Sequence, residues 1–150
     1  MSIEAIARQD VIAVPPTTSV DELVRTMREE RIGSVVIEDE EGPVGIVTDR
    51  DLVMQALGSN IDIEGMTAQD LMSGDLVTVE MDSGVYELVR TMADESVRRV
   101  PVVENGELAG IVTMDDVLVL LSMELQNLAT VIRAESPAWE TPATELSNNP

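Results

Sequence analysis

Two Thr-x-x-Asp segments carry the side chains best suited to hold a small ligand. Thr48 and Asp51 are three residues apart, as are Thr113 and Asp116. A carboxylate can accept hydrogen bonds from both hydroxyls of a ribose, and a threonine hydroxyl can reach a sugar or a phosphate. The same spacing is a close variant of the helix capping box, in which an acid in the first turn also favours the positive helix end. Ligand binding and capping both fit this spacing, and the two roles can coexist.

Arginines supply the positive charge that an anionic ligand needs. Arg98 and Arg99 form the only adjacent basic pair in the chain. A guanidinium group can hold a phosphate through two parallel hydrogen bonds; a solvated salt bridge is the alternative. Arg50 lies between Thr48 and Asp51. Its side chain is expected either to contact a phosphate or to face solvent. Carboxylates are too common in this chain to indicate a metal site, and none is predicted.

The composition excludes several kinds of chemistry. The chain has no Cys, which removes disulfides, thiolate nucleophiles and thiolate metal ligands. It also has no His, the usual general base and the commonest transition-metal ligand. These absences predict a protein that is not an enzyme and needs no cofactor.

The charge excludes two classes of partner. The 150 residues carry 29 acids against nine basic residues, all of them Arg, for a net charge of -20. Nucleic acids and anionic membranes would repel such a chain. The most apolar stretch, residues 117–121, is far shorter than a membrane span, and no targeting segment is recognisable, so a cytoplasmic location is expected. The acid-rich, Lys-free composition resembles proteins of salt-accumulating halophiles, especially haloarchaea; an ordinary acidic cytosolic protein is the alternative.

An internal repeat organises the chain. Residues 23–27, Leu-Val-Arg-Thr-Met, recur intact as residues 88–92, and Gly-Ile-Val-Thr of 45–48 recurs at 110–113. Both pairs are offset by 65 residues, which indicates two copies of one unit. The two Thr-x-x-Asp motifs therefore occupy equivalent positions in the two copies.

Each copy predicts a β-α-β-β-α unit of the α+β class. Short strands are expected at 11–14 and 76–79, and a helix begins at Ser19, which has capping-box spacing to Glu22. Its apolar stripe, Val20, Leu23, Val24 and Met27, is repeated by Val85, Leu88, Val89 and Met92. Further strands are expected at 34–37, 44–47, 100–103 and 108–112, with closing helices that begin at Thr48 and Thr113.

Two such units, each ending in Gly-Ile-Val-Thr-x-x-Asp, resemble the CBS domain family, and a tandem pair of them resembles a Bateman module. Asp70 to Ser73 is similar to the family's entry to a second domain, and Arg98 to Val103 to its middle strand. The repeat and the resemblance give domains at 6–58 and 75–122. The linker between them, 59–74, is expected to hold a short helix, since Thr67 and Asp70 have capping-box spacing. A continued helical pattern predicts an extension at 123–135, and the Pro and polar residues of 136–150 predict a flexible tail. It implies a pseudo-twofold module with two clefts between the domains.

The resemblance also implies a function. Clefts of this family commonly bind AMP, ADP, ATP or S-adenosylmethionine, so the chain is expected to be a regulatory protein that senses an adenosine-containing ligand and signals to a partner protein. The alternative is a structural adaptor for an enzyme or transporter, with vestigial clefts. A homodimer is expected, because the apolar positions of 117–132 form a helical stripe longer than one small domain covers.

The two clefts are expected to differ. Four apolar residues are candidates for the walls that enclose an adenine ring. They form two pairs at the 65-residue offset, Ile12 with Val77 and Val35 with Val100. Ordinary strand core is the alternative for all four. In the family, residues matching Arg98 and Arg99 often face the phosphate held by the other domain, here by Asp51. The cleft of Thr48 and Asp51 is thus expected to take AMP or a ligand with a longer phosphate chain. The cleft of Thr113 and Asp116 is expected to stay empty or to take a less anionic ligand such as S-adenosylmethionine.

Overall fold

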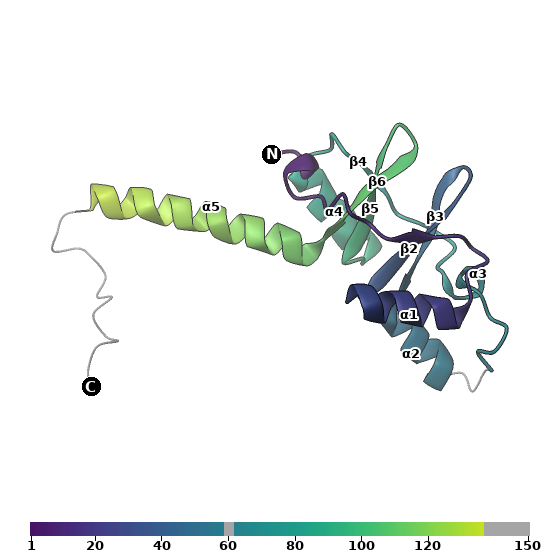
Figure 1. Ribbon diagram of the computed structural model, residues 1–150. Coiled ribbons are helices and arrows are strands. Elements are labelled where there is room, and N and C mark those ends of the chain that lie inside the picture. The colour runs from purple at the N-terminus through teal and green to yellow at the C-terminus, as the bar shows by residue number, and fades with distance from the viewer. Residues whose placement is uncertain (59–61, 137–150) are drawn as a thin grey trace, which may run out of the picture.

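The chain folds as two copies of the predicted unit, each with a small sheet and two main helices (Figure 1). The computed structural model describes residues 1–58 and 62–136; the predicted tail, from residue 137 on, lies outside this range. The first copy holds β1 (Ala13–Val14), α1 (Val20–Glu30), β2 (Ser34–Asp39), β3 (Gly42–Thr48) and α2 (Asp49–Gly58). The second holds β4 (Val79–Glu80), α4 (Val85–Glu95), β5 (Arg99–Glu104), β6 (Glu107–Thr113) and α5 (Met114–Glu135). Two short helices, η1 (Ile3–Ala5) and α3 (Ala68–Leu71), precede the two copies.

Both copies have the same sheet topology. The first strand pairs with the second in parallel, and the second pairs with the third in antiparallel fashion, giving the orders β1-β2-β3 and β4-β5-β6. The first strand of each copy has only two residues, shorter than predicted. The α+β class and the doubled β-α-β-β-α arrangement are confirmed.

Each copy has its own aliphatic core. Leu23 of α1 and Leu88 of α4 are fully buried, each in one of the two hydrophobic clusters. The predicted stripes are narrower than expected, because Val24 is 47% exposed and Val89 is 42% exposed. Both helices therefore bury three of the four predicted apolar positions.

The two copies exchange their first elements. Ile3 of η1 is fully buried in the core of the second copy, and its backbone N–H donates to the carbonyl of Ser83. Ala68 and Leu71 of α3 are buried in the core of the first copy. Because η1 and α3 are themselves related by the 65-residue offset, the exchange is reciprocal. It draws the segment that follows η1 across the boundary between the copies.

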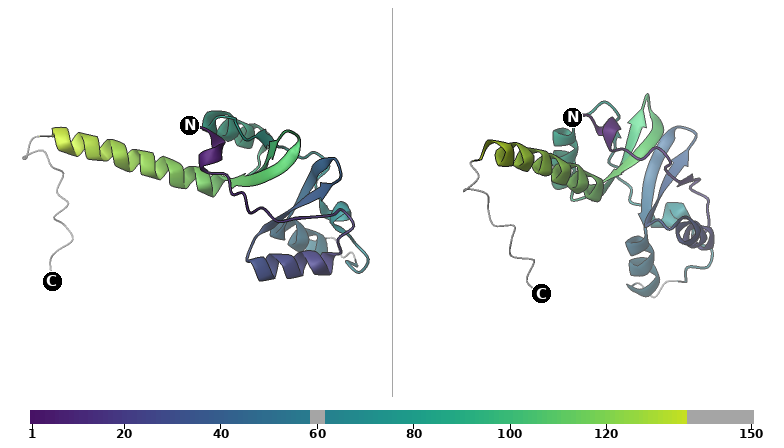
Figure 2. Two further views of the ribbon diagram at one scale, coloured as in Figure 1. Left: turned by 45° about the horizontal axis from the view of Figure 1, so that its top comes forward. Right: turned by 60° about the vertical axis from the view of Figure 1, so that its left-hand side comes forward.

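The last helix extends well past the body of the molecule (Figures 1 and 2). α5 is one continuous helix of 22 residues, capped by Thr113 and Asp116, and joins the predicted second closing helix to the predicted extension. Beyond its first two turns it is almost entirely exposed. In length and composition α5 would suffice to cross a membrane, which the five-residue apolar run at 117–121 did not indicate.

Candidate ligand cleft between the two repeats

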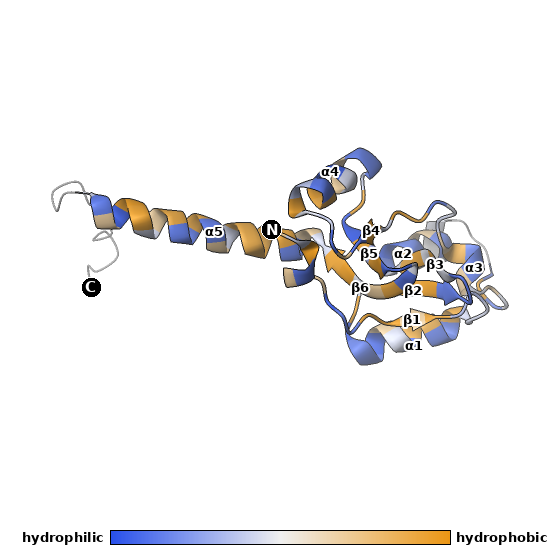
Figure 3. Ribbon diagram, turned by 90° about the horizontal axis from the view of Figure 1, so that it is seen from above, coloured by the Kyte–Doolittle hydropathy of each residue, from blue (hydrophilic) through white to orange (hydrophobic). Residues whose placement is uncertain are grey.

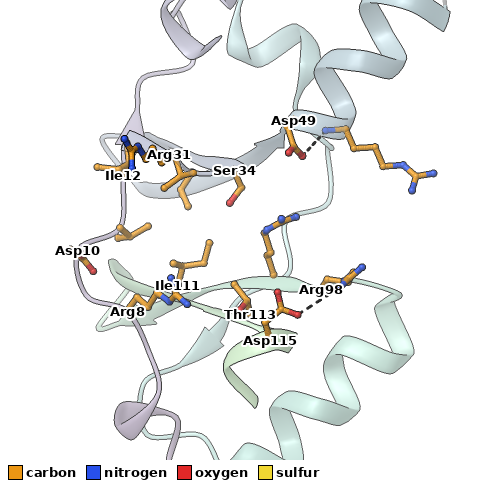
Figure 4. A pocket seen from close by; sticks show the side chains of 16 residues that line it. Arg8, Asp10, Ile12, Arg31, Ser34, Asp49, Arg98, Ile111, Thr113 and Asp115 are labelled. Atoms are coloured by element: carbon orange, nitrogen blue, oxygen red, sulfur yellow. Dashed lines mark hydrogen bonds and ion pairs between the residues drawn. The ribbon is translucent and has the colours of Figure 1, made fainter. Parts of the chain in front are cut away.

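A cavity of about 560 Å³ lies between the two copies (Figure 4). Its volume falls within the roughly 300–1,000 Å³ typical of small-molecule sites. One wall comes from the start of β1, the α1–β2 turn and the start of α2; the other comes from the Arg8 segment, the start of β5, the end of β6 and the start of α5. Its lining includes Arg8, Asp10, Ile12, Arg31, Ser34, Asp49, Arg50, Arg98, Arg99, Ile111, Thr113 and Asp115.

The cavity gathers positive charge in an acidic protein. Five of the nine arginines of the chain line it, at positions 8, 31, 50, 98 and 99, against three aspartates at positions 10, 49 and 115. Arg98 Nη2 and Asp115 Oδ1 are 3.7 Å apart, with both side chains well exposed, so this ion pair is weak. The surplus of guanidinium groups suits an anionic ligand.

The equivalent cleft on the other side is much smaller. Its volume is about 70 Å³, and its lining residues include Ser73, Asp75, Val77, Arg99 and Ile46. By the 65-residue offset these correspond to Arg8, Asp10, Ile12, Ser34 and Ile111 of the large cavity. The small cavity thus has an arginine where the large one has Ser34, and a serine where the large one has Arg8. The two clefts are unequal, as expected, but the large one lies on the Thr113 side.

Asp116 is held from two directions beside the large cavity. Its Oδ2 accepts hydrogen bonds from the backbone N–H of Thr113 at 3.0 Å and from the Thr113 hydroxyl at 2.7 Å. Its Oδ1 accepts from Arg8 Nη2 at 2.7 Å and from Arg8 Nε at 3.1 Å. Helix capping therefore uses Oδ2 of Asp116, and Arg8 covers Oδ1. The sequence predicts that this carboxylate binds the hydroxyls of a ribose.

The protonation of this pair follows from its contacts. Partial burial alone would raise the pKa of Asp116, but the hydrogen bonds from Thr113 and Arg8 outweigh it and the pKa lies below its ordinary value. The hydrogen bond to Asp116 likewise raises the pKa of Arg8. Both groups are charged at neutral pH.

Thr48 and Asp51 form the equivalent capping box without a cation. The Thr48 N–H donates to Asp51 Oδ2 at 2.8 Å, and the Asp51 N–H donates to the Thr48 hydroxyl at 3.1 Å. Neither residue lines the large or the small cavity. Their capping role is confirmed, whereas Ser73, the counterpart of Arg8, brings no charge to Asp51.

The arginines expected to serve the cleft of Asp51 all line the large cavity. Arg98 and Arg99 line the large cavity, and Arg99 also reaches the small one. Arg50 lines the large cavity as well, together with Asp115, its repeat equivalent. Of the three arginines expected at the cleft of Asp51, Arg99 alone lines the small cavity, which is the repeat equivalent of the large one, and it lines the large cavity as well.

The proposed adenine walls divide into two kinds. Ile12 lines the large cavity and Val77 the small one. Val35 and Val100 line neither; both are fully buried, one in each core. For that pair the alternative of ordinary strand core is the correct one, since their side chains point away from the clefts.

Five charged residues of the cavity were not among the predicted site residues: Arg8, Asp10, Arg31, Asp49 and Asp115. Arg8 precedes the first recognisable strand, and only the exchange of η1 brings it to the second copy, where its backbone pairs with Ile111. Arg31 ends α1 in the left-handed conformation, with φ of 56°. Asp49 opens α2 next to the cleft. No sequence pattern marks Arg31 as a cavity residue, because its left-handed conformation is visible only in the structure.

No metal site accompanies the cavity in the part of the chain described. No group of three or more acidic side chains is placed to hold an ion there, and the sequence has neither His nor Cys. The cavity lining itself offers charged groups, hydrogen-bonding groups and the aliphatic side chains of Ile12 and Ile111.

Comparisons with known proteins agree with this architecture. The sequence profile of the CBS domain matches residues 3–58 and 68–122, so each match begins at one of the exchanged short helices. An uncharacterised protein of Methanopyrus kandleri is 45% identical over 120 residues, which are 79% of this chain and 61% of the relative. Hypoxic response protein 1 of Mycobacterium tuberculosis is 36% identical over 92 residues, 61% of this chain and 64% of that protein. The chain thus spans somewhat under two thirds of these relatives.

Solved structures share the fold over most of the chain. A CBS domain pair of the protein MJ0100, in complex with 5′-methylthioadenosine and S-adenosylmethionine, matches with a TM-score of 0.73 and 25% identity, covering 83% of this chain and 98% of that one. Hypoxic response protein 1 with two coordinated zinc ions matches with a TM-score of 0.70 and 30% identity, covering 79% and 97%. A hexameric CBS-CP12 protein from cyanobacteria matches with a TM-score of 0.71 and 26% identity, covering 79% and 69%. With two profile matches, two equivalent sheets and a cleft between them, the chain belongs to the CBS domain family and is a tandem CBS domain pair.

Proposed function

We propose that this CBS domain pair is a non-catalytic sensor that binds an adenosine-containing ligand with at least one phosphate in the large cavity and signals to a partner protein. One observation carries the proposal: five arginines of a chain with net charge -20 line a single cavity of about 560 Å³. A concentration of guanidinium groups in an acidic surface favours an anionic ligand, because it offsets the repulsion from the rest of the protein. Binding of adenosine derivatives in a CBS pair of similar fold supports the adenosine part.

The cavity offers a place for each part of such a ligand. Ile12 and Ile111, from the two opposite walls, present aliphatic surface to an adenine ring. Thr113 and the neighbouring Asp116 lie where the ribose hydroxyls are expected. Arg50, Arg98 and Arg99 then face the phosphate, with Arg8 close to both sugar and phosphate. S-adenosylmethionine carries a positive charge beside its carboxylate and would use this arginine surplus less well than AMP or ATP.

Titration calorimetry in about 2 M KCl, with AMP, ATP and S-adenosylmethionine, tests the proposal. Two matched double variants show which cleft binds the ligand. One combines Thr113→Val with Asp116→Ala, and the other combines Thr48→Val with Asp51→Ala. Both remove one capping box and cost similar helix stability, about 0.5–2 kcal/mol. Only the first should weaken binding, by tenfold or more. Equal loss in both variants, or loss confined to the second, would contradict the assignment to the large cavity.

The same titrations separate the sensor from the structural adaptor. A sensor gives saturable heat with an adenine nucleotide and a higher melting temperature in its presence. Neither heat nor a stability change with any of the three ligands would favour the adaptor.

A further inference from the structure

A stripe of apolar side chains runs along the exposed part of α5. It consists of Leu118, Leu121, Leu125, Leu128 and Ile132, and each of these is between 44% and 66% exposed. The helix stands away from both sheets, and apolar residues follow it to its end (Figure 3). Within residues 1–58 and 62–136 the stripe has no cover, so leucine and isoleucine side chains face water over most of the helix.

The spacing of the stripe indicates its partner. Its members follow one another at intervals of three, four, three and four residues, an average of 3.5. This is the period of the a and d positions of a coiled coil, in which each side chain inserts between residues of a facing helix. Another helix with the same period is the surface that such a stripe fits.

A membrane fits the helix less well, although its length and composition would suffice. A helix surrounded by lipid is apolar on all sides. On α5, Ser122, Gln126 and Arg133 lie together to one side of the stripe and are exposed. In a bilayer the arginine and the amide would have to leave water, which is costly.

Charge favours a second copy of this chain as the partner. Two molecules of net charge -20 repel each other wherever their acidic surfaces meet. Between Asp116 and Glu135 the helix carries a single acid, Glu124, and a single base, Arg133. This segment is therefore the stretch of surface over which two copies can meet without a net charge.

The position of Glu124 favours a parallel alignment. In a parallel, in-register pair, each layer joins identical apolar residues, and Glu124 lies opposite Ala129 of the other copy. An antiparallel pair would set either Glu135 against Leu118 or the two Glu124 side chains beside each other. In the parallel pair the two Glu135 side chains meet only in the last turn, where solvent is close.

We propose that the α5 helices of two copies of this chain form a parallel coiled coil through the stripe of Leu118, Leu121, Leu125, Leu128 and Ile132. This assigns the homodimer expected from the sequence to a particular surface. It does not rest on the proposed ligand, because the stripe lies outside the cavity and leads away from it.

Light scattering of the full chain at micromolar concentration in about 2 M KCl tests the association. The wild-type protein should have twice the mass of one chain. Leu125→Asp should give monomers, whereas Gln126→Asp, which adds the same charge one position away from the stripe, should remain dimeric. A wild-type monomer, or a dimer that persists in Leu125→Asp, overturns the proposal.

Cysteine cross-linking tests the alignment, since the natural chain has no Cys. Under mild oxidation Leu118→Cys should form a covalent dimer, and Thr130→Cys, on the far side of the helix, should form much less. Equal cross-linking of the two variants overturns the parallel arrangement. Flotation of the wild-type protein with phosphatidylcholine vesicles, combined with a monomeric mass in their absence, would assign the stripe to a membrane and also overturn the proposal.

Discussion

Arg8 and Asp116 are 108 positions apart in sequence, yet the guanidinium group donates two hydrogen bonds to one carboxylate oxygen, at 2.7 and 3.1 Å. The Asp116 side chain is 13% exposed and that of Arg8 is 63% exposed. The oxygen that Arg8 covers is the one left over after helix capping. A ribose can therefore reach Asp116 only if Arg8 turns away, and a phosphate in the cavity gives Arg8 an alternative partner.

This exchange predicts a specific effect of Arg8→Ala. Loss of a charge-assisted hydrogen bond to phosphate, about 1.5–3 kcal/mol, should weaken AMP binding about ten- to a hundredfold. Adenosine, which has no phosphate, should bind equally well or better, because Asp116 is then uncovered. Titration of both compounds at fixed high salt measures the difference.

Arg25→Ala is the matched control for Arg8→Ala, since it removes an exposed arginine of α1 that lies away from the cavity. It should leave both affinities unchanged. If Arg8→Ala weakens AMP and adenosine to the same extent, Arg8 does not contact the phosphate.

The ion pair also predicts a pH dependence of stability. The pKa of Asp116 is lower in the folded than in the unfolded chain. The pair therefore contributes fully above the unfolded value, about 3.9, and its contribution is lost as the pH falls through the folded pKa. Because Arg8 is largely exposed, we expect a coupling free energy of only about 0.2–1 kcal/mol at neutral pH.

A double-mutant cycle with Arg8→Ala and Asp116→Asn, followed by chemical denaturation from pH 7 down to pH 3, measures this coupling. It should be constant to about pH 5 and then decline as the carboxylate is protonated. A coupling that grows on acidification would contradict the lowered pKa of Asp116 in the folded chain.

Much of the fold follows from the repeat alone. Because the two copies are related by an offset of 65 residues, each helix or strand predicted in one copy is also predicted in the other. The Thr-x-x-Asp spacing predicts both capping boxes, which the structure confirms. The exchange of η1 and α3 was not predictable from periodicity, because elements of three and four residues are too short to show a period. Because the exchange was not predicted, nothing in the sequence indicated a contact between Arg8 and Asp116.

The site was predicted less completely than the fold. Residue types at Thr113, Arg98 and Arg99 indicated an anion site, but the cleft they serve depends on which way each strand faces. The two cavities also differ in side-chain size at equivalent positions: the small one has Arg99 where the large one has Ser34, and Ser73 where the large one has Arg8. Such local volumes are set by packing in three dimensions and leave no trace in hydropathy or spacing.

Two glycines at equivalent positions allow a test of the Arg8 segment. A Cβ atom on Gly110 would lie 2.7 Å from the carbonyl oxygen of Arg8, and one on Gly45 would collide with the side chain of Met72. Both Gly110→Ala and Gly45→Ala should lower the free energy of unfolding, by about 1–3 kcal/mol. Only Gly110→Ala should also weaken AMP binding, because it displaces the backbone that carries Arg8. Equal AMP affinity in the two variants would contradict a role of this segment in the site.

The surplus of acids predicts a stability that depends on salt. Of the 29 acids, few are paired: in residues 1–58 and 62–136 the ion pairs are Arg8–Asp116, Arg90–Asp94 and Arg98–Asp115. The remaining carboxylates repel one another, and this repulsion weakens as the screening length falls from about 10 Å at 0.1 M salt to about 3 Å at 1 M. The melting temperature should therefore rise markedly between 0.1 M and 2 M KCl.

As a control, four exposed acids can be replaced by Gln: Glu29, Glu30, Glu40 and Glu41. This variant should have a higher melting temperature than the wild type at 0.1 M KCl and a smaller rise with added salt. A melting temperature that does not change with KCl, or a gain from salt that is the same in wild type and variant, would remove the halophilic interpretation of this composition, since ion-specific effects on apolar burial would act on both proteins alike.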